Sequence, residues 1–281
     1  MKPNYIIKNR ELKKNLFTEI YALTKRLYLQ IIRRPSTFIA GMIQPLLWLL
    51  LFGSLFQNIP VDLFTKNLKY EQFLSPGIII FTSFNGSVNA GLPLIFDREF
   101  GFLNRILISP LISKDSLLIS SLIYINTITI LQTTTIIIFN IFILHNNEII
   151  HYLQFILPII ILITNSIASI SICTAFIVPG HIEFLALLLL VNLPTLFSST
   201  ALAPLSFMPY WLQILACLNP ITYAIEILRY THLNYSNFNL STQIIKTVWF
   251  NFSVNDSILI LILINIMSFI LVKYIIQYKY E

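Results

Sequence analysis

Charged side chains are scarce in this sequence of 281 residues: Asp, Glu, Lys and Arg make up 11% of it, whereas hydrophobic residues make up 56%. Soluble proteins carry roughly 25% charged residues and cannot bury so large an apolar fraction. The composition therefore excludes an ordinary soluble enzyme, and the mean hydropathy of +0.78 indicates an integral membrane protein. The formal charge of +6 does not indicate a nucleic-acid partner, because half of the 18 Lys and Arg residues lie in positions 1–34, before the first long apolar run.

Motifs of nucleotide binding and hydrolysis are also missing. The sequence contains no G-x-x-x-x-G-K-[ST], no H-E-x-x-H and no nucleophile elbow. Cys173 and Cys217 have no partner at metal-ligand spacing, so we expect them to pack in apolar surroundings. The four histidines fall in connections without convergent acids, and we expect them to be surface or interfacial residues: His145, His151, His181 and His232. The chain is thus expected to have no catalytic residue, metal site or cofactor of its own.

Six runs without Asp, Glu, Lys or Arg are long enough to cross a hydrocarbon core, which takes about 20 helical residues. They cover 37–56, 74–96, 117–143, 153–178, 184–208 and 257–272. With six crossings, fourteen Lys and Arg residues fall on one side and four on the other. The positive-inside rule then places both termini on the cytoplasmic side, or the stromal side in a plastid. The sequence predicts an all-α membrane protein with six transmembrane helices.

The polar residues inside these runs are amides and hydroxyls. None of them is ionisable, although the binding of a driving proton or sodium ion generally requires an ionisable residue in the membrane. The driving force for any transport must therefore come from elsewhere. We expect the amides to form hydrogen bonds between helices, with substrate contact as the alternative for any single one. They are Gln44, Asn85, Asn126, Gln132, Asn140, Asn165, Asn192 and Asn265.

Residues 1–36 carry an apolar helical stripe with basic residues on the other faces. The stripe consists of Leu12, Leu16, Ile20, Leu23, Leu27 and Ile31. Such a helix lies in the interface plane, with its cations near anionic head groups. Two roles stay open: it anchors the first span, or it also contacts a cytoplasmic partner.

Residues 210–230 are apolar but interrupted. A spanning helix would place Glu226 and Arg229 in or near lipid, and Asn219 and Pro220 would break it. We therefore predict a re-entrant or surface-lying helical pair between the fifth and sixth spans. The alternative is a seventh crossing, which would put the C-terminus outside.

The connection at 97–110 indicates a partner protein. Its acidic start favours a helix N-terminus, Pro110 ends the helix, and an apolar face suits a groove on another protein. That face consists of Leu103, Ile106 and Leu107. The segment resembles the ABC-2 family of transporter permeases, which shows an acidic-basic-acidic triplet, a glycine, and then apolar and basic residues before a proline. The matching residues are Asp97, Arg98, Glu99, Gly101, Leu103, Arg105, Ile106, Leu107, Ser109 and Pro110.

Two further segments resemble the same family, so that the resemblance spans nearly the whole chain. The first comprises Arg34, Pro35, Gln44, Pro45, Leu46, Leu47, Leu51, Phe52 and Gly53. The second comprises Pro204, Leu205, Met208, Pro209, Trp211, Leu212, Leu218, Asn219, Pro220, Thr222, Tyr223, Ala224, Glu226 and Arg229. The sequence departs from the family at 198–200, where Ser-Ser-Thr replaces the usual Ser-Gly and puts a tight helix approach in doubt.

The resemblance implies a membrane subunit of an ATP-driven exporter, in which two permease copies pair with two separate ATPase subunits that hold ATP and Mg²⁺. It implies that 97–110 acts as the coupling helix. It also implies a re-entrant gate formed by Pro209, Trp211, Asn219, Pro220, Tyr223, Glu226 and Arg229. The chain would then lie in a plastid membrane or a bacterial inner membrane, in contact with lipid.

Two questions stay open at this point. The alternative function is an assembly or insertion scaffold that moves no substrate; an associated ATPase would discriminate the two. Small residues of the second span would let a helix approach closely, either in a homodimer or within the bundle. They are Ser83, Gly86, Ser87, Ala90 and Gly91.

Overall fold

The computed structural model describes residues 4–56, 70–108, 115–143, 153–233, 239–246 and 250–280. The first half of the chain forms α1 (Asn4–Arg33), α2 (Pro35–Leu55), α3 (Tyr70–Val88), the 3₁₀ turn η2 (Asn89–Gly91), α4 (Leu92–Glu99), α5 (Phe102–Ile108) and α6 (Asp115–Ile143). They are followed by α7 (Leu153–Ile177), α8 (His181–Phe197), η4 (Leu205–Phe207), α9 (Tyr210–Leu218), α10 (Pro220–Leu233), β1 (Gln243–Lys246), β2 (Asn251–Ser253) and α11 (Val254–Tyr280).

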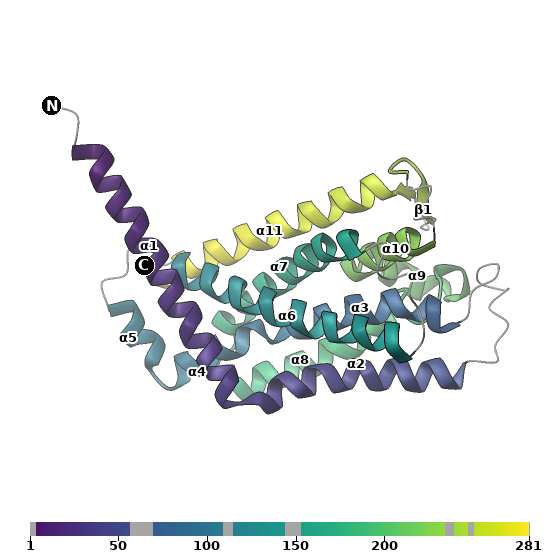
Figure 1. Cartoon of the computed structure of the whole chain (residues 1–281), viewed down its shortest axis with the longest axis horizontal. Helices are drawn as coiled ribbons and strands as arrows, with labels where there is room; N and C mark the ends of the chain where they lie inside the picture. Colours follow the sequence, from purple (N-terminus) through teal and green to yellow (C-terminus); the bar gives the residue numbers. More distant parts are fainter. Residues whose placement is uncertain are drawn as a thin grey trace.

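The helices α2, α3, α6, α7, α8 and α11 run lengthwise in the bundle (Figure 1). The lone hairpin among the described residues, β1 with antiparallel β2, lies just before α11. All six helices correspond to predicted spans, because an uncharged run can satisfy its backbone groups only as a helix when it crosses lipid. Among the described residues, five of these helices are long and apolar enough to cross a membrane, whereas α8 is shorter. The bent pair α9–α10 would add a further span if it counts as one. The chain is therefore a multi-pass, all-α membrane protein, as predicted.

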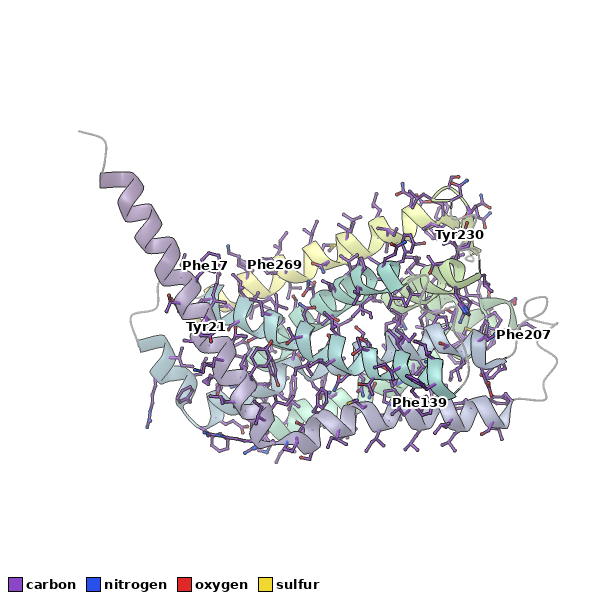
Figure 2. All side chains as sticks on the ribbon, viewed as in Figure 1. Phe17, Tyr21, Phe139, Phe207, Tyr230 and Phe269 are labelled. Atoms are coloured by element: carbon purple, nitrogen blue, oxygen red, sulfur yellow. The ribbon has the colours of Figure 1, made fainter. Side chains whose placement is uncertain are left out.

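Helix α3 forms the centre of the bundle and contacts α2, α6, α7 and α10. The most apolar window of Tyr70–Glu99 is 83% buried, against 17% for those of Pro35–Leu55 and Val254–Ile276. Side chains of the surrounding helices fill the space around α3 (Figure 2). The single bundle thus has a solid core, while α2 and α11 turn most of their apolar surface outward.

The small residues of the second span pack within this chain. Ser83 shares a hydrogen bond with Thr164 of α7 (2.9 Å). A Cβ atom on Gly86 would lie 2.7 Å from Thr129 and Gln132 of α6, and one on Gly91 would lie 2.5 Å from a carbonyl of α7. These small residues therefore allow helices of the same bundle to approach closely, which was the alternative to close approach in a homodimer.

Several of the predicted amides join neighbouring helices. Asn126 of α6 donates to Asn165 of α7 (2.6 Å), and Asn192 of α8 donates to Asn85 of α3 (3.2 Å). Asn265 of α11 donates to the backbone carbonyl of residue 162 in α7 (3.1 Å). For these residues the prediction of interhelical hydrogen bonds is confirmed.

Helix α8 is shorter than the apolar run at 184–208 from which it was predicted. It ends at Phe197 and, at 1.5 Å per residue, is about 25 Å long. The chain then turns irregularly and passes so close to α3 that a Cβ atom on Gly77 would lie 2.8 Å from the Ala201 backbone. The sequence lacks the family's Ser-Gly at 198–200, but Gly77 of α3 still lets the two chain segments approach closely.

The predicted helical pair at 210–230 is present as α9 and α10, and the angle of 87° between them fits a re-entrant segment. It lies at the end of the bundle opposite α4 and α5 (Figure 1). The N-terminal amphipathic helix is α1, which runs obliquely across the α4–α5 end and packs mainly on α6.

The C-terminal half of the apolar stripe of α1 is covered by protein, in contrast to the expectation that the stripe faces the acyl chains. Leu27 is buried in the core, with Leu23 and Ile31 packed against the same cluster. A second apolar face is exposed and includes Phe17 and Tyr21, which Figure 2 labels on α1. Helix α1 therefore contacts the bundle through one face and presents another to its surroundings.

Candidate functional site

The residues predicted from sequence lie in two regions at opposite ends of the bundle (Figure 1). We call residues 97–108 the junction, since they contain the end of α4, the turn at Gly101 and helix α5. We call α9 and α10 the re-entrant pair. Pro110 lies outside the described residues, and so does the side chain of Leu107.

Gly101 makes the turn between α4 and α5. Its φ of +70° is in the left-handed region that favours glycine, and its N–H donates to the Arg98 carbonyl (3.2 Å). The Phe100 N–H closes the last turn of α4 on the Phe96 carbonyl (3.0 Å). The glycine of the motif is thus needed for a sharp helix end, which lets α5 fold back beside α4.

Helix α5 turns its apolar stripe into its own chain. Leu103 is 1% exposed and Ile106 is 8% exposed, in a cluster that also holds Leu27 of α1. These two side chains therefore do not enter a partner's groove, in contrast to the expectation from the sequence. Among the described side chains of the junction, Phe100 (78%), Phe102 (40%) and Arg105 are exposed, together with Glu99.

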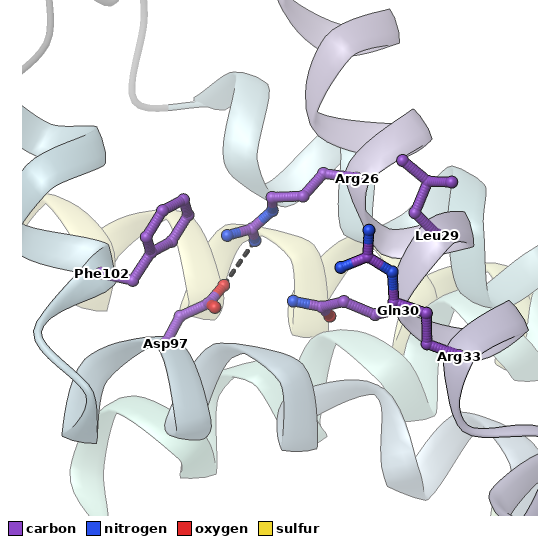
Figure 3. A pocket seen from close by; sticks show the side chains of 6 residues that line it. All are labelled: Arg26, Leu29, Gln30, Arg33, Asp97 and Phe102. Carbon is purple, nitrogen blue, oxygen red and sulfur yellow. Dashed lines mark hydrogen bonds and ion pairs between the residues drawn. The ribbon is translucent and has the colours of Figure 1, made fainter.

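Asp97 ties the junction to α1. Its carboxylate is buried and forms an ion pair with Arg26, whose guanidinium also lies 4.8 Å above the Phe102 ring (Figure 3). Because burial of a lone carboxylate is costly, Asp97 fixes the position of Arg26 and hence of α1.

Arg98 ties the junction to the C-terminal end of α7. Its guanidinium donates to the carbonyls of Ala175 (2.9 Å), Phe176 (3.2 Å) and Pro179 (2.7 Å), and to that of Val178. The last carbonyls of a helix have no intrahelical partner, and a cation there also complements the helix dipole. Arg98 therefore acts as a side-chain cap for α7.

Glu99 ties the junction to the first residue of α8. One carboxylate oxygen accepts the His181 backbone N–H (2.6 Å), and the other contacts the His181 Nδ1 (2.5 Å). A carboxylate that accepts an N–H at a helix start satisfies a free donor and complements the dipole. The three residues of the triplet thus contact three different helices, α1, α7 and α8.

Asn219 and Pro220 form the bend of the re-entrant pair. Asn219 Oδ1 accepts the Ile221 N–H (3.1 Å), which caps α10, and Pro220 occupies the first position of α10, where its missing N–H costs nothing. Asn219 Nδ2 donates to the Thr195 carbonyl near the end of α8 (2.9 Å). The bend is therefore fastened to α8.

Arg229 is the buried charge of this region. It forms an ion pair with Glu226, donates to the Thr200 carbonyl (2.7 Å) and lies 3.8 Å above the Phe73 ring. Its side chain is 5% exposed and that of Glu226 is 16% exposed. The pair thus holds α10 against α3 and against the irregular segment after α8.

The other predicted gate residues differ in their surroundings. Tyr223 is buried and donates to the Cys217 carbonyl at the end of α9 (2.7 Å). Pro209 precedes α9, and Trp211 is exposed on its first turn. The buried members stabilise the bend, whereas Trp211 belongs to an outward face.

Two partners of the triplet were not predicted as site residues. The sequence analysis assigned Arg26 to head groups and expected no acid near His181, yet Asp97 and Glu99 contact them across 71 and 82 residues of sequence. His232 is another difference, because it lies in α10 and is buried. No local motif marks any of these contacts, since each depends on how distant helices pack.

Comparisons with known proteins agree with the resemblance seen in the sequence. The family model described as ABC-2 type transporter matches residues 18–233. Relatives whose names describe transport permeases (ycf38) are 48% identical in Porphyra purpurea over 93% of this chain and 90% of the relative, and 49% identical in Pyropia yezoensis over 94% and 91%. A relative of the same name in Cyanophora paradoxa is 44% identical over 92% and 89%. The chain therefore belongs to the ABC-2 type transporter family and is a transmembrane subunit of a transport system.

Proposed function

We propose that the chain is the permease subunit of an ATP-driven exporter and that a separate ATPase moves it through the junction. The observation that carries this proposal is the triplet Asp97, Arg98 and Glu99, which joins α5 to three helices at one end of the bundle. A force applied to α5 would reach α1, α7 and α8 together. An ordinary loop would need no such set of contacts.

The docking surface of the ATPase would consist of the exposed junction residues. Phe100 and Phe102 offer aromatic area, and Arg105 offers a cation, the residue types that are enriched where proteins bind tightly. The ATPase would bind ATP and Mg²⁺, since the residues of this chain are proposed to transmit motion rather than to hydrolyse nucleotide.

Two copies of the chain would enclose the substrate path. The solid core around α3 supports this, because a path through one bundle would have to displace its most buried helix. The exposed apolar faces of α2 and α8, which meet at Trp48 and Phe197 (ring centroids 6.0 Å apart), are available for a second copy or for lipid. The re-entrant pair would close the path at the end opposite the junction.

The family relatives come from algae, and the chain's Ile- and Asn-rich composition agrees with a plastid membrane. The junction would then face the stroma, because the basic N-terminal segment lies on the same side by the positive-inside rule. Helices α1 and α11 also begin and end, respectively, at the junction end of the bundle (Figure 1). Export would run from that side to the re-entrant side.

A matched pair of variants tests the docking surface. Phe100→Asp replaces an exposed aromatic ring that stacks on Phe96. Phe250→Asp makes the same change at an exposed ring near the hairpin, which contacts the Phe252 ring edge to face. The affinity of the full-length protein for the ABC ATPase of the same organism is measured in detergent. We expect Phe100→Asp to weaken binding by about tenfold or more, from lost aromatic burial alone, and Phe250→Asp to leave it unchanged.

Failure of the wild-type protein to bind or stimulate any ABC ATPase would favour the scaffold function instead. Equal binding by the two variants would show that the ATPase docks elsewhere than on the junction.

A further inference from the structure

A cavity of about 270 Å³ lies between α1 and the junction. Its walls are six side chains, Arg26, Leu29, Gln30, Arg33, Asp97 and Phe102 (Figure 3). The four from α1 follow one another at steps of three, one and three residues, so that they share one side of the helix. The cavity lies where α1 crosses the junction obliquely, and Phe102 is the exposed junction side chain that borders it.

The side chains that line the cavity carry more positive than negative charge. Two guanidiniums face one carboxylate, and Asp97 is already paired with one nitrogen of Arg26. The other two nitrogens of Arg26, Nε and Nη1, are buried without a hydrogen-bond partner in the described part of the chain. Buried donors without a partner are costly, and an added acceptor would satisfy them.

Arg33 supplies the second cation. Arg26, Gln30 and Arg33 all come from α1, so that two cations and a neutral amide line the cavity from the same helix (Figure 3). Guanidinium groups match the oxygen geometry of phosphate groups, and they bind them more strongly than neutral donors do. The cavity thus suits a phosphate-class anion.

The surroundings of the cavity favour an anion that a lipid carries. Leu29 and Phe102 are partly exposed at its edge, and α1 presents further exposed apolar side chains at Phe17, Tyr21 and Ile32. Basic pockets between membrane helices on the cytoplasmic side bind anionic head groups in this way. A free phosphate ion would use the cations but not the apolar edge.

We propose that this cavity binds the phosphate group of an anionic membrane lipid and so joins α1 to the junction. Arg33 and the free nitrogens of Arg26 donate to the phosphate oxygens, while the acyl chains lie along the apolar side of α1. This site does not depend on the proposed ATPase, because its ligand is part of the membrane.

The test is a lipid titration of the full-length protein in detergent, followed by native mass spectrometry. The probes are phosphatidylglycerol, phosphatidylcholine and inorganic phosphate. Arg33→Gln removes a cavity cation whose side chain is exposed, and Lys25→Gln removes an exposed cation of the same helix outside the cavity. Loss of a charge-assisted hydrogen bond corresponds to about tenfold in affinity or more.

We expect phosphatidylglycerol to bind more tightly than phosphatidylcholine, Arg33→Gln to weaken it by about tenfold, and Lys25→Gln to change it less than about twofold. Equal losses in the two variants would overturn the proposal in favour of diffuse attraction. Arg33-dependent binding of inorganic phosphate without binding of phosphatidylglycerol would overturn the lipid assignment.

A second variant tests Arg26 without leaving a carboxylate unpaired. Arg26→Gln with Asp97→Asn replaces the ion pair by two amides that can still form a hydrogen bond. We expect this double variant to lose phosphatidylglycerol binding by about tenfold as well. Wild-type affinity in the double variant would show that the lipid binds elsewhere.

Discussion

Replacement of Arg98 by Met separates the transmission of motion from the docking of the ATPase. Met keeps an unbranched apolar stem but removes the guanidinium that donates to four carbonyls at the end of α7. These carbonyls would then lack their cap, and the junction would lose its hydrogen bonds to the end of α7. The side chains that the junction exposes would stay in place.

The expected magnitude follows from the type of contact. A hydrogen bond to a charged group contributes about 1.5–3 kcal/mol, and a cation at a helix C-terminus adds about 0.3–1 kcal/mol. The four carbonyls share one guanidinium, and the contact to Pro179 is exposed to solvent, so these values do not add. We expect the variant to lose about 2–4 kcal/mol of unfolding free energy.

Two assays and one control variant complete the design. Denaturant unfolding in detergent measures stability, and co-purification with the ATPase, together with stimulation of its hydrolysis, measures docking and coupling. We expect Arg98→Met to keep the ATPase bound but to lose its stimulation. Arg105→Met, at an exposed position of α5, should instead weaken ATPase binding with little change in stability. If Arg98→Met unfolds like the wild type and stimulates the ATPase equally, the contacts to α7 do not hold the junction.

Two further predictions concern packing and charge near the re-entrant end. Gly77→Ala should cost about 1–3 kcal/mol, because its Cβ would lie 2.8 Å from the backbone of Ala201; the control Gly53→Ala should cost less, because its nearest atom, at 3.4 Å, belongs to a flexible glutamate side chain. Denaturant unfolding compares the two, and equal losses would contradict the tight approach. Arg229→Leu should cost about 3–5 kcal/mol because it leaves the Glu226 carboxylate without its partner, and Arg229→Leu combined with Glu226→Leu should recover part of this loss. A double variant no more stable than the single one would show that Arg229 stabilises through its other contacts.

The membrane helices could be predicted from the sequence because lipid leaves the backbone no alternative to a helix over an uncharged run. The end of α8 could not be predicted in the same way. The run at 184–208 contains no charge that marks a boundary, and the helix ends at Phe197, shortly before Ala201 packs against Gly77 of another helix. Charge patterns thus locate crossings, whereas the end of a helix inside the membrane depends on its neighbours.

The junction shows the same division between local and distant information. The triplet and the glycine were identified through the resemblance to the ABC-2 family, and the turn at Gly101 has the geometry that a glycine permits. The direction of the apolar face of α5 could not be predicted from the sequence. Periodicity indicates that Leu103 and Ile106 share a face, but not whether their own chain or a partner covers that face. The partners Arg26 and His181 also required the structure, since 71 and 82 residues separate them from Asp97 and Glu99.

Helix α8 connects the two regions physically. Glu99 of the junction holds its first residue, His181, and Asn219 of the re-entrant bend donates to the carbonyl of Thr195 in its last turn. A continuous helix is stiff along its axis, so a shift of the first turn must reach the last turn unless the helix bends on the way. Pro194, one residue before the contact with Asn219, is the position where bending costs least. Motion at the junction would therefore either push the re-entrant bend directly through α8 or be absorbed at Pro194.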